Sequence, residues 1–209
     1  MSVFERFSAM LREGEKGIGI TIDEKWMQPL YNHWLRLLEW NARINLTAIT
    51  EMEAAVARHY LDSLALVPHL ESYSELLDVG TGAGFPGIVA AIARPELQVG
   101  VCEAVTKKTH FLLTIRRILE LKHVEVLPRR LEELPTDRKY EAITSRAVAD
   151  SARFLPMAAP YLKPGGTVFI FATCEEPDGA EGFMQHSARR YDLPGNIGPR
   201  WIIEFRSEN

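Results

Sequence analysis

The sequence predicts an α/β fold, in which a parallel sheet is packed between helices and preceded by a helical N-terminal segment. From Leu76 onward, short apolar runs alternate with stretches of helical periodicity, which is typical of parallel sheets with right-handed crossovers. Before Leu76, the apolar residues recur at helical spacing. We therefore expect a helical extension over residues 1–75 and a ligand-binding domain over residues 76–209.

Length and composition limit the class of protein. The 209 residues are 46% hydrophobic and carry a net charge of −4, as expected for one globular α/β unit with an appendage. The acidic balance argues against a protein that coats nucleic acid, although it leaves room for a local basic patch. No apolar run is long enough to span a membrane. Two cysteines far apart in the sequence indicate a reducing, cytoplasmic location.

The helical extension is predicted by apolar side chains that fall on one face of a helix: Trp26, Leu30, Trp34, Leu37 and Leu38. Residues 53–66 continue this character, and Pro68 marks its end. The tryptophans of this segment, including Trp40, are expected in the core rather than as platforms for stacked bases.

The sheet is predicted from five apolar runs and a last one near the C-terminus. The five are Glu75–Val79, Val99–Glu103, Val124–Leu127, Ala142–Ser145 and Thr167–Ala172. The helices between them are expected at Pro86–Ala93, Thr106–Leu121 and Ser151–Leu162. Pro164, Gly165 and Gly166 are expected to turn the chain into the fifth strand. Trp201–Phe205 is predicted as the last strand, after a loop at Asp192–Arg200.

A glycine-rich turn follows the first predicted strand and is the most informative feature of the chain. Asp78 ends the strand, and Gly80, Gly82 and Gly84 follow in the pattern acidic-x-Gly-x-Gly-x-Gly. Glycines suit a backbone with positive φ or one that lies against a ligand, and this pattern is the form that S-adenosylmethionine (SAM) binders use. The dinucleotide pattern also fits from Gly82 to Gly87, but its first glycine then lies too far beyond the strand.

Polar residues follow the other predicted strands at the same edge of the sheet, where ligands of such folds bind. Glu103 could accept the ribose hydroxyls of a nucleoside, or be a solvated acid. Glu132 lies where an adenine ring is commonly received, or is an exposed acid at a helix N-terminus. Arg146 could hold a carboxylate or a purine edge, or form an ion pair at the strand end.

Several other polar residues allow two interpretations. The segments Asn41–Thr47 and Arg58–Ser63 could provide helix caps and turn bonds, and His59 alone would normally be a packed histidine. The basic residues of the predicted helix over 106–121 could form a solvated face or contact nucleic acid: Lys107, Lys108, Arg116 and Arg117. Cys102 and Cys174 lack the spacing of metal ligands, so no metal is expected.

These residues together resemble the RsmG (GidB) family, bacterial SAM-dependent methyltransferases that act on N7 of a guanine in small-subunit (16S) ribosomal RNA. Six ordered strings within about residues 39–166 carry the resemblance. They are Glu39–Ile49, Arg58–Ser63, Leu77–Ile88, Lys107–Leu112, Arg130–Glu133 and Thr144–Val148.

The resemblance implies a Rossmann-like class I methyltransferase, a three-layer sandwich with SAM as cofactor and residues 76–209 as the SAM-binding domain. The resemblance also assigns five further residues to the cofactor site, in addition to Asp78, Gly82 and Glu103. They are Gly80, Phe85, Leu131, Glu132 and Arg146. Asn45, His59 and Arg130 are implied as cleft or RNA residues, with Arg146 and Arg130 expected to be catalytic. The implied partner is small-subunit ribosomal RNA or the assembling 30S subunit, bound by a cytoplasmic monomer without membrane or metal.

One departure from the family concerns the end of the fifth strand. The family carries a lysine there, and this chain has Ala172 in the string Phe169–Thr173. We expect the missing charge to weaken the contact with RNA phosphates. The tail after Glu175 also matches the family poorly.

Three other functions remain compatible with the residues alone. A SAM methyltransferase of a small molecule or protein would share the cofactor pocket. A dinucleotide-dependent oxidoreductase would use the shifted glycine pattern, and a nucleotide sensor would keep the pocket without the reaction. Guanine N7 carries a lone pair and no proton, so the favoured reaction needs no general base. The protein has only to align the reacting atoms.

Overall fold

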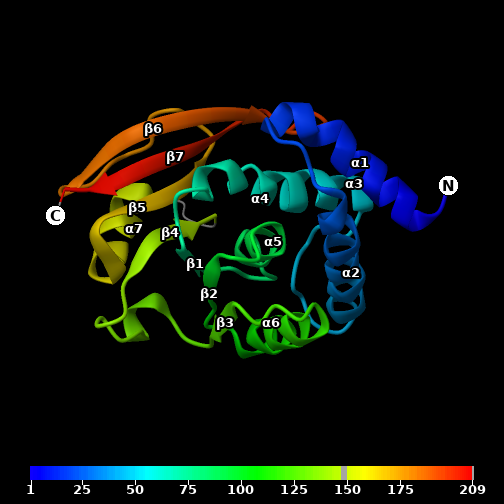
Figure 1. The fold of residues 1–209 in the computed structure, drawn as a ribbon, viewed down its shortest axis with the longest axis horizontal. Helices are drawn as coiled ribbons and strands as arrows, with labels where there is room; N and C mark the ends of the chain where they lie inside the picture. The colour runs from blue at the N-terminus through cyan, green and yellow to red at the C-terminus, as the bar shows by residue number, and fades with distance from the viewer. Residues whose placement is uncertain (147–149, 209) are drawn as a thin grey trace.

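A computed structural model describes residues 1–146 and 150–208 and shows a seven-stranded sheet with helices on both faces (Figure 1). The strands are β1 (Glu75–Val79), β2 (Gln98–Cys102), β3 (Val124–Leu127), β4 (Tyr140–Ser145), β5 (Leu162–Ala172), β6 (Phe183–Asp192) and β7 (Pro199–Ser207). Their order in the sheet is β3-β2-β1-β4-β5-β7-β6. The first five strands are parallel, whereas β7 is antiparallel to both β5 and β6.

The helical extension consists of two long helices and a broken third segment. The long helices are α1 (Val3–Ile18) and α2 (Glu24–Asn41). The third segment runs through α3 (Met52–Ala55), the π-helix η1 (Val56–Leu61), α4 (Asp62–Leu64) and the 3-10 helix η2 (Val67–Leu70). Helical structure was therefore predicted correctly here, but the π-helical turn around His59 was not.

The remaining helices follow the strands. They are α5 (Gly87–Ala93), α6 (Thr106–Ile118), the 3-10 helix η3 (Leu131–Glu133), α7 (Ser151–Ala158) and the 3-10 helix η4 (Ala159–Tyr161). The expected end of α6 at Leu121 is wrong, because Glu120 adopts a left-handed φ of 54° that stops the helix. The helix expected to reach Leu162 ends at Ala158 and tightens into η4.

Two hydrophobic cores cover the two faces of the sheet and confirm the three-layer architecture. Leu76 belongs to the core shared with α1, α2, η1, α5 and α6, whereas its neighbour Leu77 belongs to the core shared with α7. This alternation follows from the two-residue period of a strand. Trp34 lies in the first core with 2% of its surface exposed, and Trp26 and Trp40 pack against it. The N-terminal helices thus complete one layer, and the domain boundary at residue 75 stays a prediction.

The C-terminal part of the sheet differs most from the prediction. The strand β6 was missed, and Pro164–Gly166 lies within β5 at a register irregularity instead of before the strand. Gly165 has a φ of 70° there, which favours glycine. The last strand was found, with longer bounds. β6 and β7 run along one side of the molecule to α1 (Figure 1).

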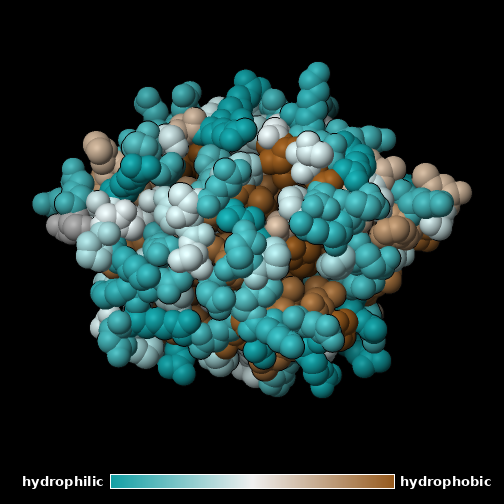
Figure 2. Space-filling view, in the orientation of Figure 1, coloured by the Kyte–Doolittle hydropathy of each residue, from teal (hydrophilic) through white to brown (hydrophobic). Residues whose placement is uncertain are grey.

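The surface in this orientation is mostly hydrophilic, with hydrophobic side chains visible mainly in the hollows (Figure 2). In the part of the chain that the structure describes, no helix is both long and apolar enough to cross a membrane.

Candidate active site

The glycine-rich turn lies between β1 and α5 and leaves open space on one side of its backbone. Gly80 and Gly82 have φ values of 70° and 62°, in the left-handed region. A Cβ atom built at either residue would meet no heavy atom within 4 Å. By contrast, a Cβ at Gly87 would lie 2.7 Å from the Val101 side chain. The first two glycines therefore leave the space beside the backbone open, whereas Gly87 permits close packing of α5 on the sheet.

Asp78 lies fully buried beneath this turn. Its Oδ2 accepts a hydrogen bond from the Gly87 backbone N–H at 2.7 Å. Within the described part of the chain, its Oδ1 and the buried hydroxyl of Thr81 have no hydrogen-bond partner. Burial raises the pKa of Asp78 to about 6, against the opposing effects of the Thr81 hydroxyl and the Gly87 N–H. The Thr81 hydroxyl thus interacts with the Asp78 carboxyl, although the two groups make no hydrogen bond of normal geometry.

Glu103 follows β2 and braces the turn from the neighbouring strand. Its Oε2 accepts from the Gly82 N–H at 3.0 Å, and its Oε1 accepts from the Val105 N–H at 2.8 Å. Lys108 lies 3.8 Å away. Since each carboxylate oxygen has more than one lone-pair site, these bonds leave capacity for the hydroxyls of a ligand. The solvated-acid interpretation does not describe this residue, which is only 6% exposed.

His59 and Arg146 are brought together although 87 residues separate them. The Arg146 guanidinium donates to the Arg58 carbonyl at 2.7 Å, and it lies 3.2 Å from the His59 Nδ1. Because a guanidinium only donates, Nδ1 accepts and the His59 proton resides on Nε2. Nε2 lies 2.9 Å from the Thr47 hydroxyl. Burial, reinforced by the charge of Arg146, lowers the pKa of His59 to about 3, so the ring is neutral at physiological pH.

Phe85 connects this pair to the glycine-rich turn. The rings of His59 and Phe85 are stacked with centroids 4.5 Å apart, and the Arg146 guanidinium lies 5.3 Å from the Phe85 centroid. Phe85 is 3% exposed. The aromatic ring thus separates the turn from the polar residues of the helical extension and fixes the distance between them.

Asp62 is a third buried carboxylate of the site, and residues of the C-terminal tail complete its surroundings. It accepts from the Tyr191 hydroxyl at 2.6 Å and pairs with Arg146 at 3.3 Å and with Arg200 at 3.4 Å. Burial, followed by the charge of Asp62, raises the pKa of Tyr191 well above its usual range. The ion-pair interpretation of Arg146 is therefore present in the structure, alongside its contact with His59.

A pocket of about 250 Å³ opens beside this cluster. Its walls combine charged groups with the aliphatic side chains of Ile49, Leu193 and Ile197. The charged residues are Arg58, Asp62, Arg146 and Arg200, and the neutral His59 lies beside them. Tyr191 and Arg200 were not predicted as site residues, because they reach Asp62 across 129 and 138 residues and no local pattern indicates such a contact.

The other predicted site residues lie farther out. Leu131 is buried in the second core, whereas Glu132, Arg130 and Asn45 are exposed. Asn41 makes turn bonds to the backbone N–H groups of Leu46 and Thr47 at 2.8 and 3.0 Å, as its alternative interpretation proposed. Ala172 is 9% exposed and lies opposite Trp201 of the neighbouring strand β7. Ala147 and Val148, which end one of the six strings, lie outside the described residues.

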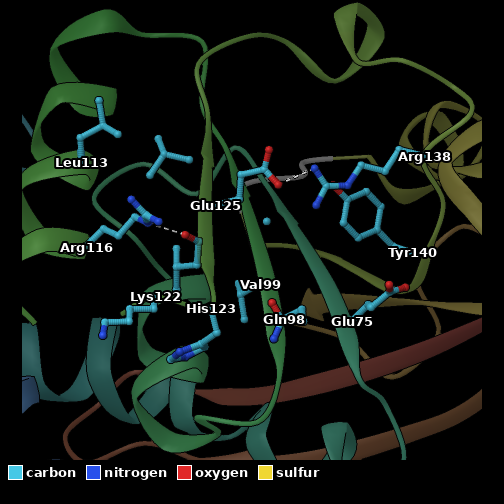
Figure 3. Close-up of a pocket in the computed structure, with 13 residues that line it drawn as sticks. Glu75, Gln98, Val99, Leu113, Arg116, Lys122, His123, Glu125, Arg138 and Tyr140 are labelled. Atoms are coloured by element: carbon cyan, nitrogen blue, oxygen red, sulfur yellow. Dashed lines mark hydrogen bonds and ion pairs between the residues drawn. The ribbon is translucent and has the colours of Figure 1, made fainter. Parts of the chain in front are cut away.

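A larger pocket, of about 430 Å³, lies at the opposite edge of the sheet, where β1, β2 and β3 begin (Figure 3). Its charged groups are engaged with the protein itself. Arg138 pairs with Glu125, and the Arg116 Nε donates to the Val124 carbonyl (Figure 3). Since ligands of such sheets bind at the carboxyl ends of the strands, the smaller pocket belongs to the candidate active site.

The fold is that of class I methyltransferases. TrmN from Thermus thermophilus aligns with a TM-score of 0.54 at 17% identity, over 82% of this chain and 52% of that one. TYW2 from P. horikoshii, solved in complex with MeSAdo, aligns with a TM-score of 0.52 at 12% identity, over 68% and 61%. At these identities the likeness establishes the fold alone.

The sequence gives the family. The family described as rRNA small subunit methyltransferase G (GidB) matches residues 27–183. A "Ribosomal RNA small subunit methyltransferase G" from Anaeromyxobacter sp. (strain Fw109-5) is 34% identical over 96% of this chain and 98% of its own length. One from Anaeromyxobacter dehalogenans is 38% identical over 96% and 97%. The chain belongs to this family, which confirms the resemblance and the enzyme class predicted from the sequence.

Proposed function

We propose that this protein transfers a methyl group from SAM to N7 of a guanine in small-subunit ribosomal RNA, as a cytoplasmic monomer. The observation that carries the proposal is the open space beside the backbone of Gly80 and Gly82, with Glu103 bonded to the Gly82 N–H from the neighbouring strand. The family membership supports the choice of substrate.

The residues at the turn fit a nucleoside ligand that carries an amino acid. The glycines would let the backbone lie against it, since a side chain at either position would fill the open space. Glu103 would accept from the ribose hydroxyls while keeping its bond to the Gly82 N–H. When bound, SAM supplies an electrophilic methyl group on a sulfonium.

The reaction requires the protein to align the reacting groups, and it does not require the protein to transfer a proton. Guanine N7 attacks through a lone pair, so no base has to remove a proton first. This agrees with the state of His59, which is neutral, buried and held between Thr47 and Arg146. Arg146 is likewise held by His59, Asp62 and the Arg58 carbonyl. We assign to both residues the orientation of the reacting groups and the exclusion of water.

The pocket beside Asp62 is the proposed site of the guanine. Ile49 and Leu193 offer aliphatic surface for the faces of a base. Arg146 and Arg200 offer donors suited to a purine edge, which presents O6 and N7 as acceptors. The exposed Arg58 and Arg130 would contact phosphates around the target nucleotide.

The proposal is tested by methyl transfer from labelled SAM to small-subunit particles that lack the modification, followed by nucleoside analysis. We expect label in 7-methylguanosine and binding of SAM, but not of NAD, by calorimetry. Gly82→Val serves as the negative control, because its side chain would enter the open space and a β-branched residue is strained at a φ of 62°. If SAM binds but both naked and assembled RNA stay unlabelled, the ribosomal substrate is wrong. Binding of NAD without SAM would instead contradict the cofactor.

A further inference from the structure

His33 on α2 contacts the glycine-rich turn from the helical extension. Its ring is fully buried, and its Nε2 lies 3.0 Å from the carbonyl oxygen of Ala83. Its Nδ1 lies 2.8 Å from the hydroxyl of Tyr60, which belongs to the π-helix η1. One imidazole thus joins α2, η1 and the turn, three segments that lie far apart in the sequence.

The partners of the ring determine which nitrogen carries the proton. A carbonyl oxygen can only accept, so Nε2 donates to Ala83. Nδ1 is then the acceptor, and the Tyr60 hydroxyl donates to it. Burial lowers the pKa of His33 to about 4, which keeps the ring neutral and this tautomer in place at physiological pH.

The Ala83 carbonyl shares a peptide plane with the N–H of Gly84, and the two groups point in opposite directions. That N–H donates to the Thr81 carbonyl at 3.0 Å. The bond from His33 therefore fixes one side of the plane, while Thr81 fixes the other. Gly82 and Gly84, on either side of Ala83, have positive φ values of 62° and 96°. Glycines are the residues least able to hold a backbone conformation by themselves, so the anchor has to come from elsewhere.

Aromatic contacts also hold the His33 ring in place against the glycine-rich turn. The His33 ring meets Phe85 edge to face at 5.1 Å and Phe111 of α6 at 5.7 Å. Phe85 in turn carries the stacked ring of His59. A displacement of His33 would therefore shift both the glycine-rich turn and, through Phe85, the His59 ring.

We propose that His33 is a positioning residue for the cofactor: through Ala83 it holds the glycine-rich turn in the conformation that receives SAM. This inference rests on the proposed function, and it gives the helical extension a part in cofactor binding. Its alternative is that His33 only packs the core between α2 and η1.

Two substitutions of His33 separate these alternatives. In His33→Gln the side-chain amide reaches the place of Nε2 and can donate to Ala83. In His33→Asn the shorter amide can pair with Tyr60 but does not reach Ala83. Both remove ring volume, so both should lower the unfolding midpoint. We expect the Kd for SAM to stay within about threefold of the parent in His33→Gln and to rise about tenfold in His33→Asn.

Tyr60→Phe is the matched control, because it disturbs the same buried cluster and leaves the His33–Ala83 bond in place. Its Kd for SAM should remain within about twofold of the parent. Amide hydrogen exchange at Gly84 supplies an independent readout and should accelerate only in His33→Asn, beyond any change in global stability. Should His33→Asn fail to fold, slower exchange in His33→Gln than in His33→Ala still supports the proposal.

Equal SAM affinities in all the folded variants would overturn the role of His33 while leaving the proposed function intact. An equal loss of affinity in Tyr60→Phe and His33→Asn would also overturn it, because general loosening would then explain the effect. A parent protein that binds no SAM would instead refute the proposed function itself.

Discussion

Glu103 combines two tasks, since it braces the Gly82 N–H and faces the space where the ribose is proposed to bind. Glu103→Ala should therefore weaken SAM binding. A hydrogen bond to a charged group contributes roughly 1.5–3 kcal/mol, which corresponds to an increase in Kd of at least about tenfold. Glu103→Gln keeps one acceptor oxygen, enough for one of the two backbone N–H groups, and should lose less. Calorimetric titration with SAM measures both.

A matched control for Glu103 lies on α1. Glu13 is exposed and far along the chain from the turn, so Glu13→Ala changes the net charge equally and should leave the Kd unchanged. If Glu103→Ala binds SAM as tightly as Glu13→Ala does, Glu103 serves only to brace the turn.

The depressed pKa of His59 predicts a pH dependence of stability. The ordinary pKa of 6.5 falls to about 3 in the folded state. Between these values the unfolded chain binds a proton that the folded chain does not. The stabilisation is therefore complete above pH 6.5 and declines toward pH 3, by about 1.4 kcal/mol per pH unit for one proton.

His59→Gln removes this titration, so its free energy of unfolding should fall less steeply between pH 6 and pH 4.5 than that of the parent. Urea unfolding at both pH values provides the measurement. The opposing titration of Asp78, whose pKa is raised to about 6, is common to both proteins and cancels in the comparison. Parallel pH profiles would show that His59 is not held neutral.

The antiparallel pair β6–β7 does more than extend the sheet, because it closes the pocket over Asp62. Tyr191→Phe removes a 2.6 Å bond from a buried carboxylate and should reduce the free energy of unfolding by roughly 1.5–3 kcal/mol. Tyr73→Phe is a suitable comparison, since its hydroxyl donates to the neutral Thr167 hydroxyl at 2.9 Å. Its cost should be nearer 1 kcal/mol. Equal costs in urea unfolding would mean that Asp62 draws no particular support from the tail.

The elements that the sequence predicted well are those whose burial produces a periodic pattern. β1 and β3 were predicted with the bounds that the structure shows, because both end at turn residues. β6 was missed because this edge strand is held mainly by backbone pairing to β7 and carries mostly half-exposed or exposed side chains. Because apolar and polar residues do not alternate along β6, the sequence shows no two-residue hydrophobic period that would predict a strand there.

The candidate site also contains residues that could be predicted from the sequence and residues that could not. The turn at Gly80 and Gly82 and the acids at the ends of β1 and β2 could be placed from local pattern and topology alone. His33, Tyr191 and Arg200 could not, since each reaches the site through tertiary packing over 50 residues or more. A buried histidine in a helix gives no signal in the sequence that distinguishes a packing role from a positioning one.

The molecule as a whole must bind a polyanion although its net charge is −4. Several cations form ion pairs with acidic residues: Arg6, Arg12, Arg36 and Arg138. Arg58 and Arg130 are exposed, and Arg58 lines the pocket that is proposed to receive the guanine. With only a few exposed cations around the site, we expect the protein to bind RNA weakly in general. We expect it to bind a folded ribosomal surface more tightly.

Salt dependence of RNA binding tests this distribution of charge. Each phosphate contact contributes about 0.7–0.9 to the slope of log K against log salt concentration. Arg58→Gln and Arg130→Gln should each lower the slope by roughly this amount and weaken binding at low salt. Lys16→Gln makes the same change in net charge on the exposed surface of α1 and should leave the slope unaltered. Filter binding to unmodified small-subunit particles at several salt concentrations gives the slopes. Equal slopes in all three variants would mean that overall charge, and not these two arginines, governs the encounter with RNA.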